Sequence, residues 1–316
     1  MKSVEAYPWL KKTANELLMM PALPNSFIIE GNKGLGKSEL AFDLIQKQLC
    51  QENTGCNYCQ SCLLFKENTH PEFLLVNLDE KKSFISIKQI REVIDFMNLT
   101  VSNNSSRIAL ILNADRLNIE SQNALLKTLE ENSTKKFIFL VCNARNALLP
   151  TIYSRCFIKR IATPDTESIN NWLNSQGIFD VSANDFPNFY SPKMIKTLVE
   201  EGKSNLYNNV LSKLDDLICG NEGAVTTQQF FKDLDINFPE KIDLMVQYVL
   251  LKIGVQTSFY KPHTKFNSLR KTDANDIDAA SFLNELIEYK STLLKIPGLN
   301  EQIAMSYFLN KMDRVF

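Results

Sequence analysis

The chain has 316 residues, of which 44% are hydrophobic and 22% are charged, and 35 Lys and Arg against 36 Asp and Glu leave a formal net charge of -1. This composition is that of an ordinary folded protein and excludes fibrous and low-complexity classes. The length predicts two or three domains. The even charge balance excludes a molecule-wide basic surface, so any contact with DNA would be local or made through partners.

The N-terminal stretch has no apolar core of the kind found in signal peptides, and no segment approaches the ~20 apolar residues of a membrane span. We therefore expect a cytoplasmic protein with no membrane partner. In that reducing compartment the seven cysteines are expected to be thiols or metal ligands rather than disulfides.

Apolar strands alternate with amphipathic helices through the first half of the chain. Continuous apolar segments such as residues 108–112 predict strands buried on both faces, and hence a parallel sheet covered by helices. The predicted strands are residues 26–30, 73–78, 107–113, 136–143 and 157–161, and the predicted helices are residues 39–51, 87–98 and 121–131.

The motif GNKGLGKS follows the first predicted strand and has the spacing of a phosphate loop. Gly31, Gly34 and Gly36 let the backbone curl so that N–H groups and the helix N-terminus face phosphate oxygens. Lys37 would neutralise phosphate charge, and the Ser38 hydroxyl would reach Mg²⁺. We therefore expect ATP or ADP with Mg²⁺ at the carboxyl end of this strand. The alternative is a Gly- and Lys-rich turn that fits the pattern by chance.

Four cysteines with the spacing C-x5-C-x2-C-x2-C follow the first predicted helix, at Cys50, Cys56, Cys59 and Cys62. Four thiolates can close a tetrahedral Zn²⁺ site, which gives a small polar loop a fixed shape. An iron–sulfur cluster is disfavoured because the ferredoxin pattern adds a further cysteine followed by proline. Unligated thiols are the other alternative. Structural zinc is the preferred interpretation.

The remaining cysteines and the two histidines give no comparable signal. Cys142, Cys156 and Cys219 are expected to lie in the core. His70 and His263 are isolated, so no ligand role is predicted for either.

The strand that should carry catalytic acids lacks them. In P-loop ATPases a second strand ends in an acid that holds Mg²⁺, and an adjacent Glu commonly activates the attacking water. Here Leu112 and Asn113 stand at those positions. Asp115 lies beyond the strand end and is expected to have a helix-start or surface role. The sequence therefore predicts nucleotide binding without hydrolysis.

A domain boundary is predicted after residue 161. Thr163 reads as a helix N-cap and Pro164 as the first helical residue. Downstream, apolar residues recur at helical spacing and the strand signal fades. Residues 259–276 are polar and irregular and are predicted to form a loop. The predicted helices are residues 166–176, 193–201, 205–219, 226–234, 239–255, 276–295 and 300–312.

Several local motifs resemble the bacterial DNA polymerase III clamp loader, a branch of the AAA+ ATPases. The motifs are NALLKTLEE at 123–131, Ser-Arg-Cys at 154–156, Thr-His-Pro-Glu at 69–72 and the cysteine cluster. The missing acids and the opening Tyr-Pro-Trp-Leu at 7–10 are most similar to the delta-prime branch rather than to the hydrolysing gamma/tau branch. The resemblance is dense from about residue 7 to residue 161 and thin afterwards.

The resemblance implies a fold of class α/β plus all-α. It implies an AAA+ P-loop domain with a parallel sheet at 1–162, with the cysteine zinc module at 50–62 inserted in it. A small helical lid at 163–206 and a C-terminal helical collar for oligomerisation at 207–316 would follow.

The resemblance also implies roles for single residues. Arg155 matches the family's arginine finger, which reaches the ATP held by a neighbouring subunit. The sensor-1 position, a Thr in the hydrolysing subunit, falls at Asn143, and the sensor-2 arginine position falls at Lys193. Both departures weaken the case for independent ATPase activity.

The implied function is that of a stator in a hetero-pentamer with gamma/tau and delta subunits, which loads the sliding clamp onto primed DNA under ATP control. The chain would be a DNA polymerase holoenzyme subunit without polymerase activity of its own. A hydrolysing gamma/tau-type subunit is disfavoured by Leu112 and Asn113. A P-loop small-molecule kinase would not need the cysteine cluster or the helical tail, and a zinc-containing nucleic-acid-binding module would need a basic face.

Overall fold

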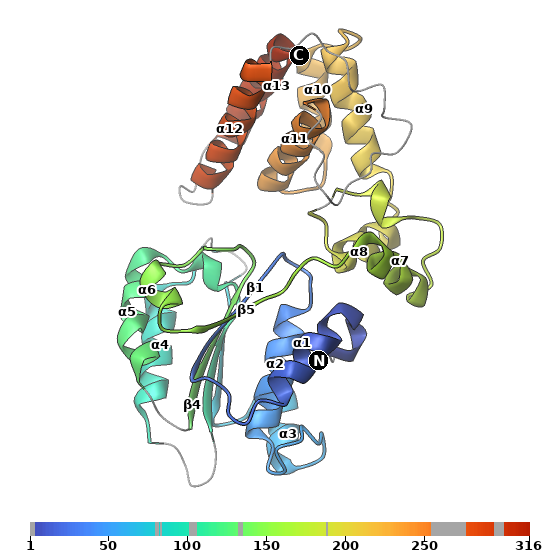
Figure 1. Ribbon diagram of the computed structural model, residues 1–316. Helices are drawn as coiled ribbons and strands as arrows, with labels where there is room; N and C mark the ends of the chain where they lie inside the picture. Colours follow the sequence, from blue (N-terminus) through green and yellow to red (C-terminus); the bar gives the residue numbers. More distant parts are fainter. Residues whose placement is uncertain are drawn as a thin grey trace. The chain divides into compact units, whose positions relative to one another are not determined.

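The computed structural model describes residues 4–79, 82, 84–100, 106–131, 135–187, 189–253, 276–293 and 300–316. The chain forms two compact units, Met1–Pro164 and Asp165–Phe316 (Figure 1). This division falls close to the end predicted for the first domain. The further division of the second half into a lid and a collar at residue 206 stays a prediction.

The first unit is built on a parallel sheet, as predicted. Its strand order is β2-β3-β4-β1-β5, and each neighbouring pair is parallel. Four strands end one or two residues before the predicted positions; after β3 the chain leaves the sheet through Asn113, whose φ of 53° is in the left-handed region. The strands are β1 (Ser26–Glu30), β2 (Phe73–Val76), β3 (Arg107–Ile111), β4 (Lys136–Cys142) and β5 (Phe157–Arg160).

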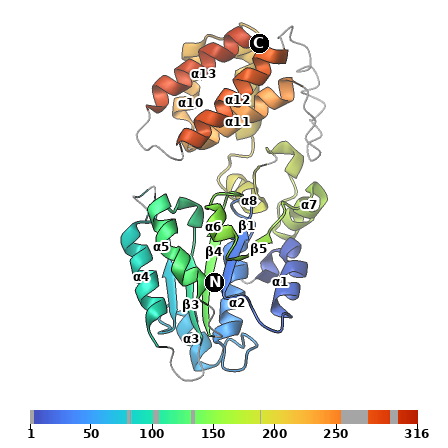
Figure 2. The same ribbon diagram turned by 60° about the vertical axis from the view of Figure 1, so that its left-hand side comes forward.

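Helices cover both faces of this sheet. Figures 1 and 2 show α1, α2 and α3 on one face and α4, α5 and α6 on the other. Alternate residues of β1 separate into the two cores, since Phe27 and Ile29 pack with the first group of helices and Ile28 with the second. The helices are α1 (Lys11–Leu18), α2 (Lys37–Leu49), α3 (Gln60–Lys66), α4 (Ile87–Asn98), α5 (Ile119–Glu130) and α6 (Pro150–Tyr153).

The helix predictions for this unit were right for α2, α4 and α5 and missed the rest. α4 matches its predicted bounds because Ser86 and Gln89 form a capping box at its start. The missed helices α1, α3 and α6 are only about one or two turns long, so none displays the repeated apolar spacing that identifies a helix.

The described residues of the second unit form helices joined by loops and turns, with no strand among them. Its core packs large aromatic side chains such as Tyr207, Tyr248 and Phe308. The predicted loop at 259–276 lies outside the described residues, except for Asp276 at the start of α12. The helices are α7 (Thr166–Ser175), α8 (Pro192–Glu200), α9 (Leu206–Ile218), α10 (Ala224–Asp233), α11 (Phe238–Lys252), α12 (Asp276–Leu293) and α13 (Glu301–Val315).

Two predictions about single residues in this part of the chain were wrong. The N-cap of α7 is Asp165 rather than Thr163, because the Asp165 carboxylate accepts a 2.7 Å hydrogen bond from the Ser168 N–H. Cys219 is exposed at the end of α9, whereas Cys142 is buried and Cys156 is partly buried as expected.

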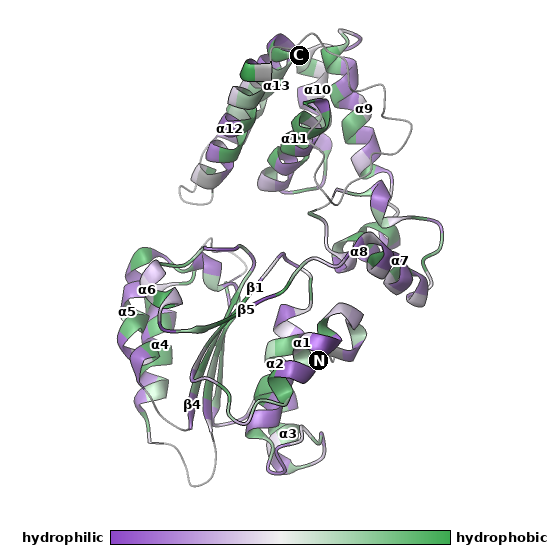
Figure 3. Cartoon of the chain, viewed as in Figure 1, coloured by the Kyte–Doolittle hydropathy of each residue, from purple (hydrophilic) through white to green (hydrophobic). Residues whose placement is uncertain are grey.

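Hydropathy follows the layers within each unit. Figure 3 shows hydrophobic residues along the strands and polar residues on the outer faces of the helices. Across the helices that the structure describes, none has the length and apolar character needed to cross a membrane.

Candidate functional site

The phosphate loop joins β1 to α2 and depends on glycine at its last turn. Gly34 and Gly36 have φ values of +82° and +85°, a region that side chains disfavour. A Cβ on Gly36 would lie 2.7 Å from the Leu10 Cδ1 atom and 2.9 Å from the Tyr7 ring. Both the backbone conformation and the packing therefore require glycine at position 36.

The N-terminal segment packs against the phosphate loop, which the sequence pattern alone did not predict. The Tyr7 hydroxyl donates to Glu39 Oε1 at 2.8 Å, and the Trp9 indole N–H donates to the Leu35 carbonyl at 3.0 Å. Leu35 is fully buried. The loop is thus held from outside by residues that precede the sheet.

Lys37 lies at the start of α2 and is 3% exposed. Its ammonium donates to the Asn32 carbonyl at 2.6 Å and to Asn143 Oδ1 at 3.0 Å. Burial lowers the pKa of Lys37 to about 8, although Asp115 acts in the opposite direction. A phosphate oxygen could take over these two contacts and would favour the charged form.

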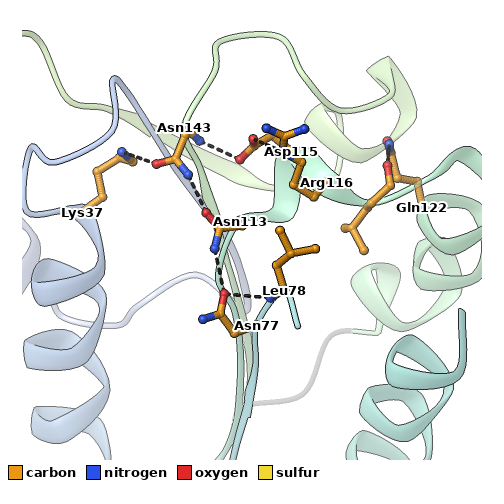
Figure 4. A network of polar contacts seen from close by, with 9 residues as sticks. Lys37, Asn77, Leu78, Asn113, Asp115, Arg116, Gln122 and Asn143 are labelled. Atoms are coloured by element: carbon orange, nitrogen blue, oxygen red, sulfur yellow. Dashed lines mark hydrogen bonds and ion pairs between the residues drawn. The ribbon is translucent and has the colours of Figure 1, made fainter. Parts of the chain in front are cut away.

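A row of amide side chains crosses the carboxyl ends of β2, β3 and β4 (Figure 4). Asn143 Nδ2 donates to Asn113 Oδ1 at 2.7 Å, and Asn113 Nδ2 donates to Asn77 Oδ1 at 2.7 Å. The row thus begins at Lys37 and continues through three neutral amides. The sequence singled out Asn113 and Asn143 one at a time, but their contact depends on the strand order.

Asp115 lies in the first turn of the 3-10 helix Ala114–Arg116, in keeping with the predicted helix-start role, but it takes part in this network instead of facing solvent. Its side chain is 13% exposed, and Oδ1 accepts a 2.8 Å hydrogen bond from the Asn143 backbone N–H. It is the single carboxylate among the residues labelled in Figure 4. Leu112 is packed against the hydrophobic core. One engaged carboxylate therefore stands where hydrolysis normally requires acids to bind Mg²⁺ and activate water.

Arg155 follows α6 and lies at the surface of the first unit, with a side chain that is 31% exposed. Its Nε donates to Glu130 Oε1 at 2.6 Å, and Nη1 donates to the Thr151 carbonyl at 2.8 Å. Glu130 is itself 53% exposed. An exposed ion pair of this kind holds its partners weakly, so the guanidinium can exchange Glu130 for another anion at small cost.

The four cysteines of the predicted metal cluster lie together between the end of α2 and the start of α3. Their sulfur atoms all lie within 4.8 Å of one another. The Sγ atoms of Cys50 and Cys59 are 4.0 Å apart, as are those of Cys56 and Cys62. Thiolates bound tetrahedrally at ~2.3 Å from one ion would be roughly 3.8 Å apart. The cluster can therefore hold one metal ion.

Backbone N–H groups around this cluster favour the thiolate form that a metal needs. The N–H groups of Cys56, Cys59 and Cys62 donate to the sulfur atoms of Cys50, Cys56 and Cys59 at 3.3–3.5 Å. Burial opposes ionisation of Cys50, but backbone hydrogen bonds from Cys56, Thr54 and Glu52 outweigh it and lower the pKa of Cys50 to about 5. Burial raises the pKa of Cys62 to about 12, and a bound cation would reverse that effect.

His70 is buried and has structural contacts rather than a ligand role. Its Nδ1 accepts the Glu72 N–H at 3.1 Å, so Nε2 carries the proton and donates to the Ser61 hydroxyl at 2.9 Å. These contacts join α3 to β2. His263 lies outside the described residues. Lys193, at the predicted sensor-2 position, lies in the first turn of α8.

The sequence of the chain is similar to that of a known protein family. Residues 9–165 match the family model described as DNA polymerase III, delta subunit. The chain is 31% identical over 176 residues to DNA polymerase III subunit delta' of Yersinia pestis, covering 54% of this chain and 52% of that protein. It is 28% identical to the Escherichia coli K12 subunit of the same name, covering 54% and 53%.

The chain thus spans about half the length of the curated relatives that it matches. Among solved structures, a DNA polymerase III gamma subunit-related protein from Thermotoga maritima aligns over 97% of this chain and 99% of its own, with 16% identity and a TM-score of 0.44. On the match over residues 9–165, the chain belongs to the DNA polymerase III delta-prime subunit family.

Proposed function

We propose that the chain is the delta-prime subunit of a clamp loader and assists ATP-dependent loading of a sliding clamp onto primed DNA. Family membership supports the proposal. The observation that carries it is a well-formed phosphate loop beside a strand end that offers amides in place of catalytic acids. Such a subunit would bind ATP without hydrolysing it, so any contribution that it makes to hydrolysis would be at the ATP site of another subunit.

In this proposal Arg155 makes that contribution by acting on the ATP held by an adjacent gamma/tau subunit. A guanidinium against the γ-phosphate stabilises charge in the transition state, which is worth ~10³ to 10⁵ in rate in other P-loop systems. Its surface location and its weakly held partner Glu130 support the assignment. A finger must be able to leave its own subunit's acid and reach across an interface.

The proposed assembly is a cytoplasmic hetero-pentamer with gamma/tau and delta subunits that meets the sliding clamp and primed DNA. The helical residues from 207 onwards would form the collar through which the subunits assemble. The phosphate loop, with Gly31, Gly34, Gly36, Lys37 and Ser38, would hold ATP or ADP with Mg²⁺ passively. Ser38 would supply an Mg²⁺ ligand, but the amide row lowers the number of anionic ligands around the ion.

The cysteine cluster is proposed to bind structural Zn²⁺. Metal analysis of the purified chain should return about one Zn per chain, because four thiolates close the coordination shell. Cys59→Ser is expected to lose the metal and to lower Tm, whereas Cys219→Ser, which removes an exposed thiol outside the cluster, should keep it. A visible absorption band would indicate iron–sulfur instead, and a metal-free native protein would contradict the proposal.

The finger assignment is tested in the reconstituted clamp loader. Arg155→Ala should lower hydrolysis at the adjacent ATP site by ~10³-fold while the complex still assembles. Arg91→Ala removes the same charge from an exposed position on α4 and serves as the matched control. Single-turnover hydrolysis and size-exclusion chromatography give the two readouts. Equal rates for the two variants would remove Arg155 from its proposed role.

A further inference from the structure

Glu30 is a fully buried acid at the junction of the sheet and the phosphate loop. It is the last residue of β1, and its side chain is 0% exposed. A buried carboxylate is costly unless each oxygen is satisfied. Oε1 accepts from Arg160 Nε at 2.6 Å, and Oε2 accepts from the Tyr153 hydroxyl at 3.0 Å.

The two donors flank Arg155 in the sequence. Tyr153 is the last residue of α6, and Arg160 is the last residue of β5. Backbone pairing adds to the contact between Glu30 and Arg160. The two residues are partners in the sheet, and the Ile161 N–H donates to the Glu30 carbonyl at 2.8 Å. One carboxylate therefore fastens both ends of the segment that carries Arg155.

In the hydrogen bond between Tyr153 and Glu30, the phenol is always the donor and the carboxylate the acceptor. Burial, and then the hydrogen bond to Glu30, raise the pKa of the Tyr153 phenol, so the hydroxyl keeps its proton and donates. The Arg155 N–H bonds to the Ile152 carbonyl at 3.0 Å, which continues the turn of α6 into the finger residue. A shift of Tyr153 would thus move the backbone of Arg155.

We infer that Glu30 is a positioning residue for Arg155. It holds the α6–β5 segment in place, so that the Arg155 guanidinium can reach the nucleotide of a neighbouring subunit. The inference rests on the proposed function of Arg155. In this role Glu30 acts through Tyr153 and Arg160 and does not itself contact the nucleotide. The matched site is Glu72, a 6% exposed acid that pairs with Arg107 elsewhere in the first unit.

The test compares Glu30→Gln with Glu72→Gln in the reconstituted clamp loader. Both variants replace a buried carboxylate by an amide and should lower Tm. Glu30→Gln is expected to lower kcat of the complex ~10-fold with KM for ATP unchanged, because misplacing a catalytic group by about 1 Å can cost up to ~10²-fold. Glu72→Gln should keep the native kcat. Tyr153→Phe, which removes one hydroxyl, should reproduce the effect if Glu30→Gln does not fold.

A double variant separates positioning from general damage. In the Arg155→Ala background, Glu30→Gln or Tyr153→Phe should cause no further loss of kcat, because residues that act through one another are not additive. An additive loss, or a kcat equal to that of Glu72→Gln, would overturn the inference. If Arg155→Ala itself leaves hydrolysis unchanged, the proposed function fails first, so the two failures are distinguishable.

Discussion

The phosphate loop follows β1 and Arg155 precedes the neighbouring strand β5, but the two regions differ in nearly every property that bears on chemistry. Lys37 is 3% exposed and bonded to a carbonyl and an amide, whereas the Arg155 side chain is 31% exposed and bonded to a surface acid. In the proposed function, the phosphate loop binds a nucleotide but has amides where catalytic acids would stand. Arg155 would supply a transition-state cation to the nucleotide of a neighbouring subunit. Binding and catalysis can therefore be divided between subunits.

The largest effect expected at the phosphate loop is from removing its lysine. Lys37→Ala should weaken ATP or ADP binding by the isolated chain ~100-fold, because charge-assisted hydrogen bonds to phosphate are the strong contacts of such a site. Isothermal titration calorimetry gives the affinity.

The matched control for that variant is Lys33→Ala, which removes an exposed lysine from the same loop. It should bind nearly as the native chain does. If the two variants bind equally, the loop is not a nucleotide site. In the complex, Lys37→Ala should lower ATP hydrolysis less than Arg155→Ala does. The reverse order would contradict the proposal that the phosphate loop only binds nucleotide while Arg155 acts in hydrolysis.

A smaller effect is expected from pH. The pKa of Lys37 is lowered to about 8 by burial, so nucleotide affinity of the isolated chain should be flat below that value and should fall about tenfold per pH unit above it. Titrations from pH 7 to pH 9.5 measure this, with Lys37→Arg as a control that keeps its charge throughout. An affinity that stays constant to pH 9.5 would contradict burial of the ammonium.

The effect of Lys37 on folding stability should change with pH in the direction opposite to its effect on nucleotide affinity. The folded state disfavours the charged ammonium, so its cost is present below about pH 8 and is relieved as pH rises towards the ordinary value of 10.5. The Lys37 contribution to the free energy of unfolding therefore becomes more favourable over the range in which affinity declines. The difference between native and Lys37→Ala unfolding curves isolates it.

The sequence predicted those features that depend on local patterns. Gly34, Gly36 and Lys37 lie at fixed spacing behind an apolar strand, and the cysteine cluster lies within one short stretch, so periodicity and spacing were sufficient. The parallel sheet followed from the alternation of buried strands and helices. Helix α3 was missed because it is short and its start depends on Cys59 accepting the Cys62 N–H.

Contacts between residues at the ends of neighbouring strands could not be predicted from local sequence patterns. Asn77 joins Asn113 and Asn143 only because β2, β3 and β4 lie side by side. Asp115 was expected to have a helix-start or surface role because it lies beyond the strand end. It does start the 3-10 helix Ala114–Arg116, but its contact with Asn143 could not be read from local sequence. Glu30 gave no signal as a single acid before a glycine. These side chains acquire their roles only when the sheet forms.

We propose that this chain binds nucleotide without hydrolysing it and contributes Arg155 to a neighbouring subunit. Steady-state ATP hydrolysis by the purified chain alone, measured with and without primed DNA, tests this division of roles. We expect negligible turnover in both conditions together with measurable nucleotide binding, because Asp115 is the one carboxylate among the residues labelled in Figure 4. DNA-stimulated turnover by the isolated chain would show that it hydrolyses ATP itself.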